Sequence, residues 1–263
     1  MFAGTSLYDD FSYVHGLLAS YVHYRGVFLP FHRLMIHTLE ATLQQTCGYN
    51  GSLPYWDWTL DHEDLAKSPV WDPIRGFGGN GVPQEDGSSC VTDGPFGNST
   101  RHWTGKHDTL YGVERDPHCL SRKFEVGASV ATLQFSISPT VVKSTLDQAE
   151  YGDFFYLLET NPHNAIPQLV RGDFLMFTAP NDPLFYLHHG QLDRLWWVWQ
   201  MRDAKRRLEV PSNLIDNGAV SGGDKINASF NSGGLPLQGL AEDRRLEDVM
   251  DTQGGLLCYT YDS

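Results

Sequence analysis

The sequence is poor in positive charge and has no long apolar run. Its 263 residues include 19 lysines and arginines against 32 aspartates and glutamates, which gives a formal net charge of −13. A balance this acidic argues against nucleic acid or an anionic membrane surface as a partner. No apolar stretch approaches the length that a membrane-spanning helix needs. A chain of this length can bury one sizeable core, so we expect a single domain over residues 1–263.

Cysteine is also scarce, and the four residues are spread along the chain: Cys47, Cys90, Cys119 and Cys258. No two of them have the Cys-x-x-Cys spacing of a zinc or redox site. Four cysteines can pair in three ways. We favour Cys47 with Cys258 and Cys90 with Cys119, and four free thiols are the alternative.

Three N-glycosylation sequons begin at Asn50, Asn98 and Asn227. Together with the even number of cysteines and the acidic charge, they favour a secreted, extracellular glycoprotein with disulfide bonds. The first residues, Met1–Ala3, do not form a signal peptide. The localisation is therefore an expectation about the protein rather than a signal read from this chain.

Two clusters of histidines are the most informative feature of the sequence. The first lies among aromatic residues in the segment Tyr8–Glu40 and has spacings of 8 and 9 residues: His15, His23 and His32. The second follows about 130 residues downstream: His163, His188 and His189. Imidazoles are the commonest protein ligands for copper, zinc and iron. Three of them in an apolar setting predict half of a metal site.

The residues around these histidines resemble a known family. The stretch FLPFHRLMIHTLE at 28–40, PYWDW at 54–58 and DPLFYLHHGQLDRLW at 182–196 are similar to the two copper-binding signatures of the tyrosinase and catechol oxidase family, the type-3 copper proteins. The likeness covers roughly residues 8–200, and CGYNGSLPYWDW, FGGNG and DGPF are typical of the short fungal members. Family members carry more sequence before the first histidine, so we expect a truncated N-terminus.

The resemblance implies a fold and an activity. The fold is mainly α: a tyrosinase-like central four-helix bundle around the metal site, with long irregular loops and minor β structure. The activity is that of a copper-dependent oxidoreductase with two copper ions, which oxidises a small phenol or catechol to an o-quinone with O2. The alternative is a degenerate member that lacks phenol oxidase activity or serves a narrow biosynthetic oxidation. An O2 carrier resembling hemocyanin is a third possibility. The sequence does not reveal the substrate or the oligomeric state.

The family motifs also imply a set of metal ligands. The first copper would be held by three side chains: His15, His23 and His32. The second would be held by His163 and His189, because the family pattern of a histidine, three residues and an aspartate selects His189. Neighbouring helical residues point about 100° apart. His188 is therefore expected to pack or to make a hydrogen bond.

The chain departs from the family at the second site. In the family, another histidine follows the Pro-His-Asn histidine after four residues, but here that position is Pro167, which has no donor atom. A pair of sites with five histidines is one outcome, and an empty or weak second site is another. A replacement ligand from the long loop is the third, with three candidates: His102, His107 and His118.

Further roles follow from the resemblance. Glu159 would correspond to the acid that holds a water near the second copper beside Asn164, a pair associated with deprotonation of monophenols; a surface carboxylate at a helix end is the alternative. Phe185, one helical turn before His189, would overhang the copper pair, or simply be a core aromatic. Asp193 could orient a histidine N–H or pair with Arg33.

The expected helices follow from apolar periodicity and breaker residues: 8–23, from about 32 to 47, 139–159 and from about 182 to 207. His32 should lie in the first turn of the second helix, and the helix after His163 should start at Pro167. Residues 49–125 and 211–240 should be irregular. The final LCYTYD is β-like and contains the family's closing Tyr-x-Tyr pattern at Tyr259 and Tyr261.

Overall fold

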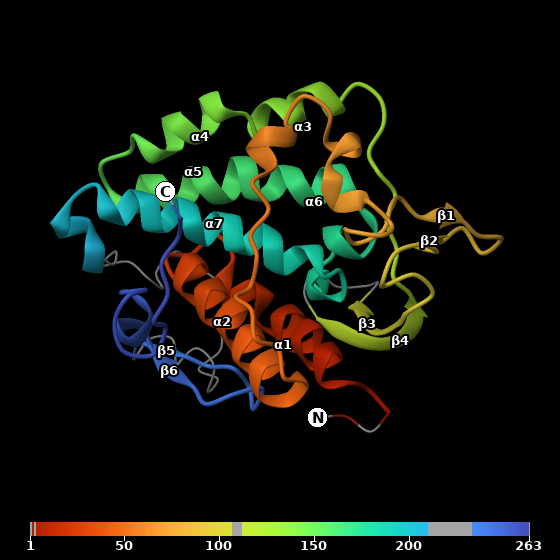
Figure 1. Cartoon of the computed structure of the whole chain (residues 1–263), viewed down its shortest axis with the longest axis horizontal. Coiled ribbons are helices and arrows are strands. Elements are labelled where there is room, and N and C mark those ends of the chain that lie inside the picture. The colour runs from red at the N-terminus through yellow and green to blue at the C-terminus, as the bar shows by residue number, and fades with distance from the viewer. Residues whose placement is uncertain (1, 3, 107–111, 210–232, 263) are drawn as a thin grey trace.

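The first two helices have ends that local residues explain. In the computed structural model, which describes residues 2, 4–106, 112–209 and 233–262, α1 spans Leu7–Val22 and α2 spans Phe28–Cys47 (Figure 1). The Ser6 hydroxyl accepts a hydrogen bond from the Asp9 N–H, and the Asp9 carboxylate accepts one from the Ser6 N–H. This capping box starts α1. Gly48, with a φ of 68°, ends α2 and confirms the predicted end.

The start of α2 differs from the prediction. The helix begins at Phe28, so His32 lies in its second turn rather than its first. Pro30 lies inside the first turn, where the N–H that proline lacks would have no helical partner. The proline therefore does not prevent the helix from starting early.

The region 139–159 forms two helices instead of the expected one. α4 spans Pro139–Leu146 and α5 spans Tyr151–Leu158. Trp199 donates its indole N–H to the Gln148 carbonyl at 2.8 Å, which satisfies one backbone group that the break exposes. The other long helices are α3 at Val130–Ser136, α6 at Asn164–Val170 and α7 at Leu184–Met201.

A π-helix at Glu159–His163 joins α5 to α6, so the helical backbone runs on from α5 into α6. The expectation that this last helix starts at Pro167 is wrong. Pro167 lies inside α6, after the helical backbone has already formed, and it lacks the N–H that would bond to the preceding turn. Single π turns inside helices are frequent at functional sites, and this one ends at His163.

The long helices pack around one apolar core. Figure 1 shows α5 and α6 running along α7, with α1 and α2 packed on the other side of α7. The Phe154 ring stacks on Trp199 at 4.9 Å between centroids, which joins α5 to α7. α7 is buried on most sides, as its sequence indicates. The predicted mainly α fold with a helical centre is confirmed by this arrangement.

Short elements complete the described chain. Seven 3-10 turns connect the helices: Trp58–Asp61, Leu65–Lys67, Pro69–Trp71, Gly172–Leu175, Ala179–Asn181, Ala204–Leu208 and Leu246–Val249. Three antiparallel hairpins form the β structure: β1 Val82–Pro83 with β2 Ser89–Cys90, β3 Thr100–Gly105 with β4 Val113–Cys119, and β5 Gly234–Leu235 with β6 Arg244–Arg245. The β3–β4 hairpin lies within the region 49–125 that was expected to be irregular. No helix in the described ranges is long and apolar enough to cross a membrane.

The cysteine prediction is half right. Cys90 and Cys119 form a disulfide between β2 and the end of β4. Cys47 and Cys258 are free and exposed, so the second favoured pair is wrong. The Cys258 thiol instead donates to the Gly255 carbonyl at 3.3 Å.

The end of the described chain lacks the β structure that its sequence predicts. Leu257–Asp262 does not form a strand, because Cys258 has a φ of 53°, which interrupts an extended backbone. Of the predicted loop 211–240, residues 211–232 lie outside the described residues, as do Asn227 and His107.

Candidate metal centre

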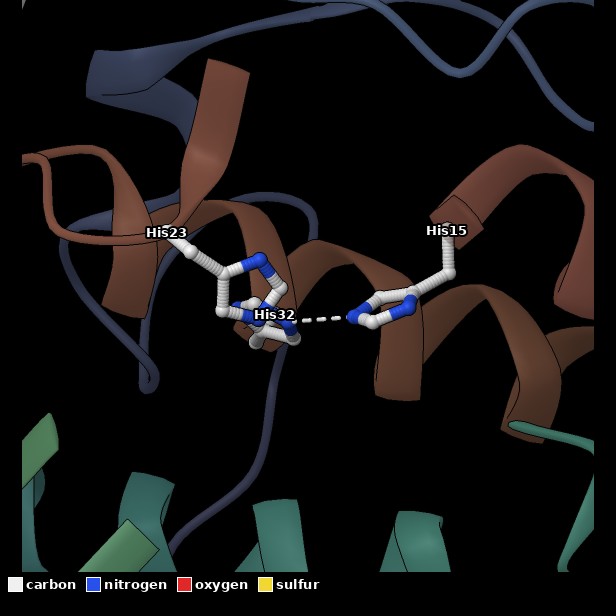
Figure 2. A group of neighbouring side chains, drawn as sticks. All are labelled: His15, His23 and His32. Carbon is white, nitrogen blue, oxygen red and sulfur yellow. Dashed lines mark hydrogen bonds between the residues drawn. The ribbon is translucent and has the colours of Figure 1, made fainter. Parts of the chain in front are cut away.

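His15, His23 and His32, the first histidine group, converge from two neighbouring helices. His15 is on α1, His23 caps the end of α1, and His32 is on α2. Figure 2 shows the three rings pointing toward one another. Each pair of ring centroids is 5.2 to 5.3 Å apart. One nitrogen from each ring lies within 4.8 Å of the others, and all three residues are buried.

Backbone carbonyls fix the orientation of each ring in the first histidine group. The Nδ1 of His15 contacts the Phe177 carbonyl at 2.6 Å. The Nδ1 of His23 contacts the Ala19 carbonyl at 3.0 Å, and that of His32 contacts the Phe28 carbonyl at 2.7 Å. A carbonyl only accepts, so each Nδ1 carries the proton and each Nε2 is left with a lone pair. This is how a metal-binding histidine is usually held.

Two of these lone pairs face each other. The Nε2 of His15 and the Nε2 of His32 are 3.1 Å apart (Figure 2). Since both Nδ1 atoms already hold the ring proton, neither Nε2 has one to donate to the other. Two acceptors at this distance repel unless a cation lies between or beside them. The donor set, three neutral imidazoles, is one that copper or zinc accepts.

His163, His188 and His189, the second histidine group, come from the π-helix and from α7. One nitrogen of each lies within 4.8 Å of the others, and all three residues are buried. The Nδ1 of His163 donates to the Asn164 side-chain oxygen at 3.0 Å. In His188, by contrast, neither ring nitrogen has a hydrogen-bond partner among the described residues. Of the two roles expected for His188, the hydrogen bond is absent among the described residues, and the ring packs against those of His163 and His189.

Burial keeps both groups neutral. It lowers the pKa of His15 to about 3 and that of His23 to about 4. Burial also lowers the pKa of His188 to about 3, against a smaller opposing effect of the His163 carbonyl. For the remaining rings, burial and the neighbouring imidazoles hold the pKa well below its usual value: His32, His163 and His189. The neutral ring is the form that binds metal.

The two groups adjoin each other across a cavity. The His23 and His163 ring centroids are 5.8 Å apart, and the His32 and His189 rings are stacked. A cavity of about 270 Å³ opens onto five of the six histidines. Phe185 also lines it, with its ring centroid 4.3 Å from that of His189. The Phe185 ring thus lies against the histidines at the cavity, and its role above a copper pair stays a prediction.

Asn164 and Pro167 also line this cavity. Asn164 accepts from His163 and donates its amide N–H to the Tyr24 hydroxyl at 3.2 Å, so its side chain orients neighbours on both sides. Pro167 contributes only apolar atoms. The cavity wall therefore offers no metal ligand at position 167.

Glu159 has a different environment from the one that the resemblance implies. It is fully buried, and both carboxylate oxygens accept from the Tyr24 backbone N–H, at 2.8 and 2.9 Å. It is not among the described residues that line the cavity, and no aspartate or glutamate is. Burial raises the pKa of Glu159 to about 8. Its contacts hold the turn after His23, where Tyr24 has a φ of 57°.

Asp193 takes one of its two expected partners. Its carboxylate pairs with the Arg33 guanidinium at 2.5 Å, and both side chains are almost fully buried. The hydroxyls of Tyr259 and Tyr261 donate to the other carboxylate oxygen. Arg33 lies next to His32 in α2, so this network ties the second helix to α7 and to the end of the described chain.

The proposed replacement ligands from the long loop are engaged elsewhere. His102 contacts the Asp9 carboxylate at 3.1 Å, and His118 contacts the Asp173 carboxylate at 2.8 Å. His107 lies outside the described residues. The convergence of His188 with His163 and His189 was not predicted, although the sequence held a signal: two consecutive histidines in an apolar helix, beside a site that lacks a donor.

Comparisons with known proteins agree on one family. The sequence matches the family model described as "Common central domain of tyrosinase" over residues 5–202. It is 47% identical to the "Tyrosinase-like protein phomQ1" of Diaporthe leptostromiformis, over 98% of this chain and 69% of that protein. It is 39% identical to the "Tyrosinase ustQ" of Aspergillus flavus, over 97% of this chain and 69% of that protein. The structure is similar to that of a variant of the polyphenol oxidase from Thermothelomyces thermophila, with a TM-score of 0.80, 27% identity and coverage of 99% of this chain and 79% of that one.

Proposed function

The chain belongs to the tyrosinase family, and on that premise we propose that it is a copper-dependent oxidase that converts phenols or o-diphenols to o-quinones with O2. The observation that supports this proposal is the pair of histidine groups on one cavity. Each group offers three buried imidazoles to an ion. Six neutral nitrogen donors in two adjoining sets suit a pair of copper ions better than calcium or magnesium, which prefer oxygen.

When bound, a pair of copper ions would supply the electron transfer between the substrate and O2. Two o-diphenols lose four electrons and four protons in total, and one O2 takes them up to give two waters and two o-quinones. The protein holds the six rings neutral and oriented. It also supplies a largely apolar cavity, since a volume of about 150 Å³ is already enough to bind benzene, and this one measures about 270 Å³.

We further propose that diphenols are better substrates than monophenols. A monophenol has to lose its proton and gain an oxygen, whereas a diphenol already carries both oxygens. The described cavity lining contains no carboxylate to accept the phenol proton, and the Asn164 oxygen is engaged by His163. Glu159, the expected acid, contacts the Tyr24 backbone instead.

We propose that the protein is secreted. The Cys90–Cys119 disulfide suits an oxidising compartment. The sequon residues Asn50 and Asn98 are both exposed, so both are accessible to glycosylation. Mass spectrometry of protein from a eukaryotic secretory host would reveal glycans at these two positions.

The test of the main proposal uses the copper-loaded chain. Copper per chain is counted by inductively coupled plasma mass spectrometry, and O2 uptake and o-quinone absorbance are followed with catechol and with a monophenol. We expect two coppers, one O2 for every two catechols, and faster turnover of catechol. Zinc-loaded protein, which cannot change oxidation state, is the control. One copper or none, with no O2 uptake, would favour the degenerate family member instead.

A further inference from the structure

The position of Pro167 leaves the second site short of a donor. Pro167 lines the cavity but offers no lone pair, so the family pattern provides only His163 and His189 there. The first histidine group has three imidazoles. A second copper of similar affinity needs a third donor from somewhere in the cavity wall.

Among the described residues, His188 is the one ring of the two groups whose two nitrogens are both buried without a hydrogen-bond partner. The residue is 0% exposed, and both of its nitrogens are buried without a partner among the described residues. A buried polar group left unpaired destabilises the folded state. Such a group in a native fold calls for an explanation, and an ion is one of the usual ones.

The geometry directs His188 toward the same point as its neighbours. Its ring centroid is 5.4 Å from that of His163 and 5.3 Å from that of His189. Consecutive residues on a helix start about 100° apart, which argues against a shared ion when only the sequence is known. The two rings nevertheless extend far enough for their nitrogens to converge with one from His163, within 4.8 Å.

From these observations we propose that His188 is the third imidazole of the second copper site and takes the place that Pro167 leaves without a donor. The inference rests on the proposed function, because it needs a second copper. It adds a ligand that the family motif does not provide.

The test compares His188→Phe with wild type and with His62→Phe. Phenylalanine keeps a ring at position 188 but removes both nitrogens. His62 is partly exposed, belongs to neither histidine group and contacts the Thr59 carbonyl through its Nδ1, so its variant is a matched control. Each protein is loaded with copper and desalted. Copper is then counted, and the Cu(II) electron paramagnetic resonance (EPR) signal is integrated.

We expect two coppers with little EPR signal in wild type and in the His62 variant, because adjacent Cu(II) ions couple. The His188→Phe protein should hold one copper with a full signal. In the metal-free state it should melt at or above the wild-type temperature, since the change removes an unpaired buried group. Two coupled coppers in His188→Phe would overturn the inference while leaving the proposed function intact. One copper or none in wild type would overturn both.

A second measurement does not depend on whether the variant folds. A crystal structure of the copper-loaded wild type should place a His188 nitrogen about 2.0–2.1 Å from the second ion, the usual length of a metal–imidazole bond. A His188 ring that stays out of bonding reach of that ion would contradict the assignment.

Discussion

The rings of His32 and His189 lie face to face, with centroids 4.1 Å apart and planes inclined by only 8°. His32 belongs to α2 and the first histidine group, and His189 belongs to α7 and the second. This stack is the closest ring contact between the two groups. It makes the two candidate sites neighbours, as electron transfer from two ions to one O2 requires.

The first prediction concerns stability with and without copper. Copper should raise the melting temperature, because it relieves the facing lone pairs of His15 and His32. At a free concentration about 100 times Kd, one bound ion adds about 2.7 kcal/mol, which corresponds to a shift of about 5 °C or more. The check is circular dichroism melting with copper and with a chelator. His32→Phe should lose most of the shift, and an equal shift in both proteins would contradict the prediction.

The second prediction separates a buried ion pair from an exposed one. Asp193→Ala leaves the fully buried Arg33 guanidinium without its carboxylate, and should lower the free energy of unfolding by about 3–5 kcal/mol. Asp147→Ala removes the same group from exposed pairs with Lys143 and Arg202, and should lower the free energy of unfolding far less. Urea titration of the metal-free proteins gives both values. Equal losses of unfolding free energy in the two variants would contradict the prediction that burial of the Arg33 pair makes its loss more costly.

The third prediction concerns the role of Glu159. Glu159→Leu removes both acceptors of the Tyr24 N–H and frees the turn that holds His23. We expect copper affinity to fall about 10- to 100-fold, as it does when a group that orients a ligand is lost. Glu159→Gln keeps one carbonyl oxygen and should bind nearly as well as wild type. Competition titration measures the affinities. Unchanged affinity with a lower kcat would instead support the catalytic role that the family resemblance implies.

The fourth prediction concerns the pH dependence of folding stability at the His118–Asp173 pair, which is not part of the described cavity lining. Burial lowers the pKa of His118, but the hydrogen bond and charge of Asp173 outweigh it and raise the pKa to about 9. A raised pKa in the folded state means that the stabilisation is complete below the ordinary value of about 6.5 and is lost as the pH rises through 9. His118→Gln should therefore cost on the order of 1–2 kcal/mol at pH 6 and much less at pH 10. Urea titrations of both proteins at the two pH values test this, and a cost independent of pH would disprove it.

Local sequence was enough to predict the first half of the site. The motif residues His15, His23 and His32 lie within one short stretch, and the structure brings them together. The end of α2 at Gly48 is also a local signal, because glycine adopts positive φ readily. The helical class followed from the same periodicity and from the resemblance.

The parts that sequence did not predict depend on distant contacts. Whether His188 reaches the second group depends on where the π-helix places His163, and a π turn has no clear sequence signature. The environment of Glu159 depends on the Tyr24 backbone, 135 residues earlier. A carbonyl in the break between α4 and α5 accepts from Trp199, which lies 51 residues later in the sequence.

The two histidine groups also differ in how freely they can evolve. His23 and His32 each donate to a carbonyl one turn earlier in the chain. The orientation of each ring is therefore set by a nearby residue and does not depend on distant parts of the chain. The second group is assembled from two separate segments; Asn164 orients His163, whereas neither nitrogen of His188 has a hydrogen-bond partner among the described residues. Evolution can therefore replace metal ligands in the second histidine group while the first histidine group stays unchanged.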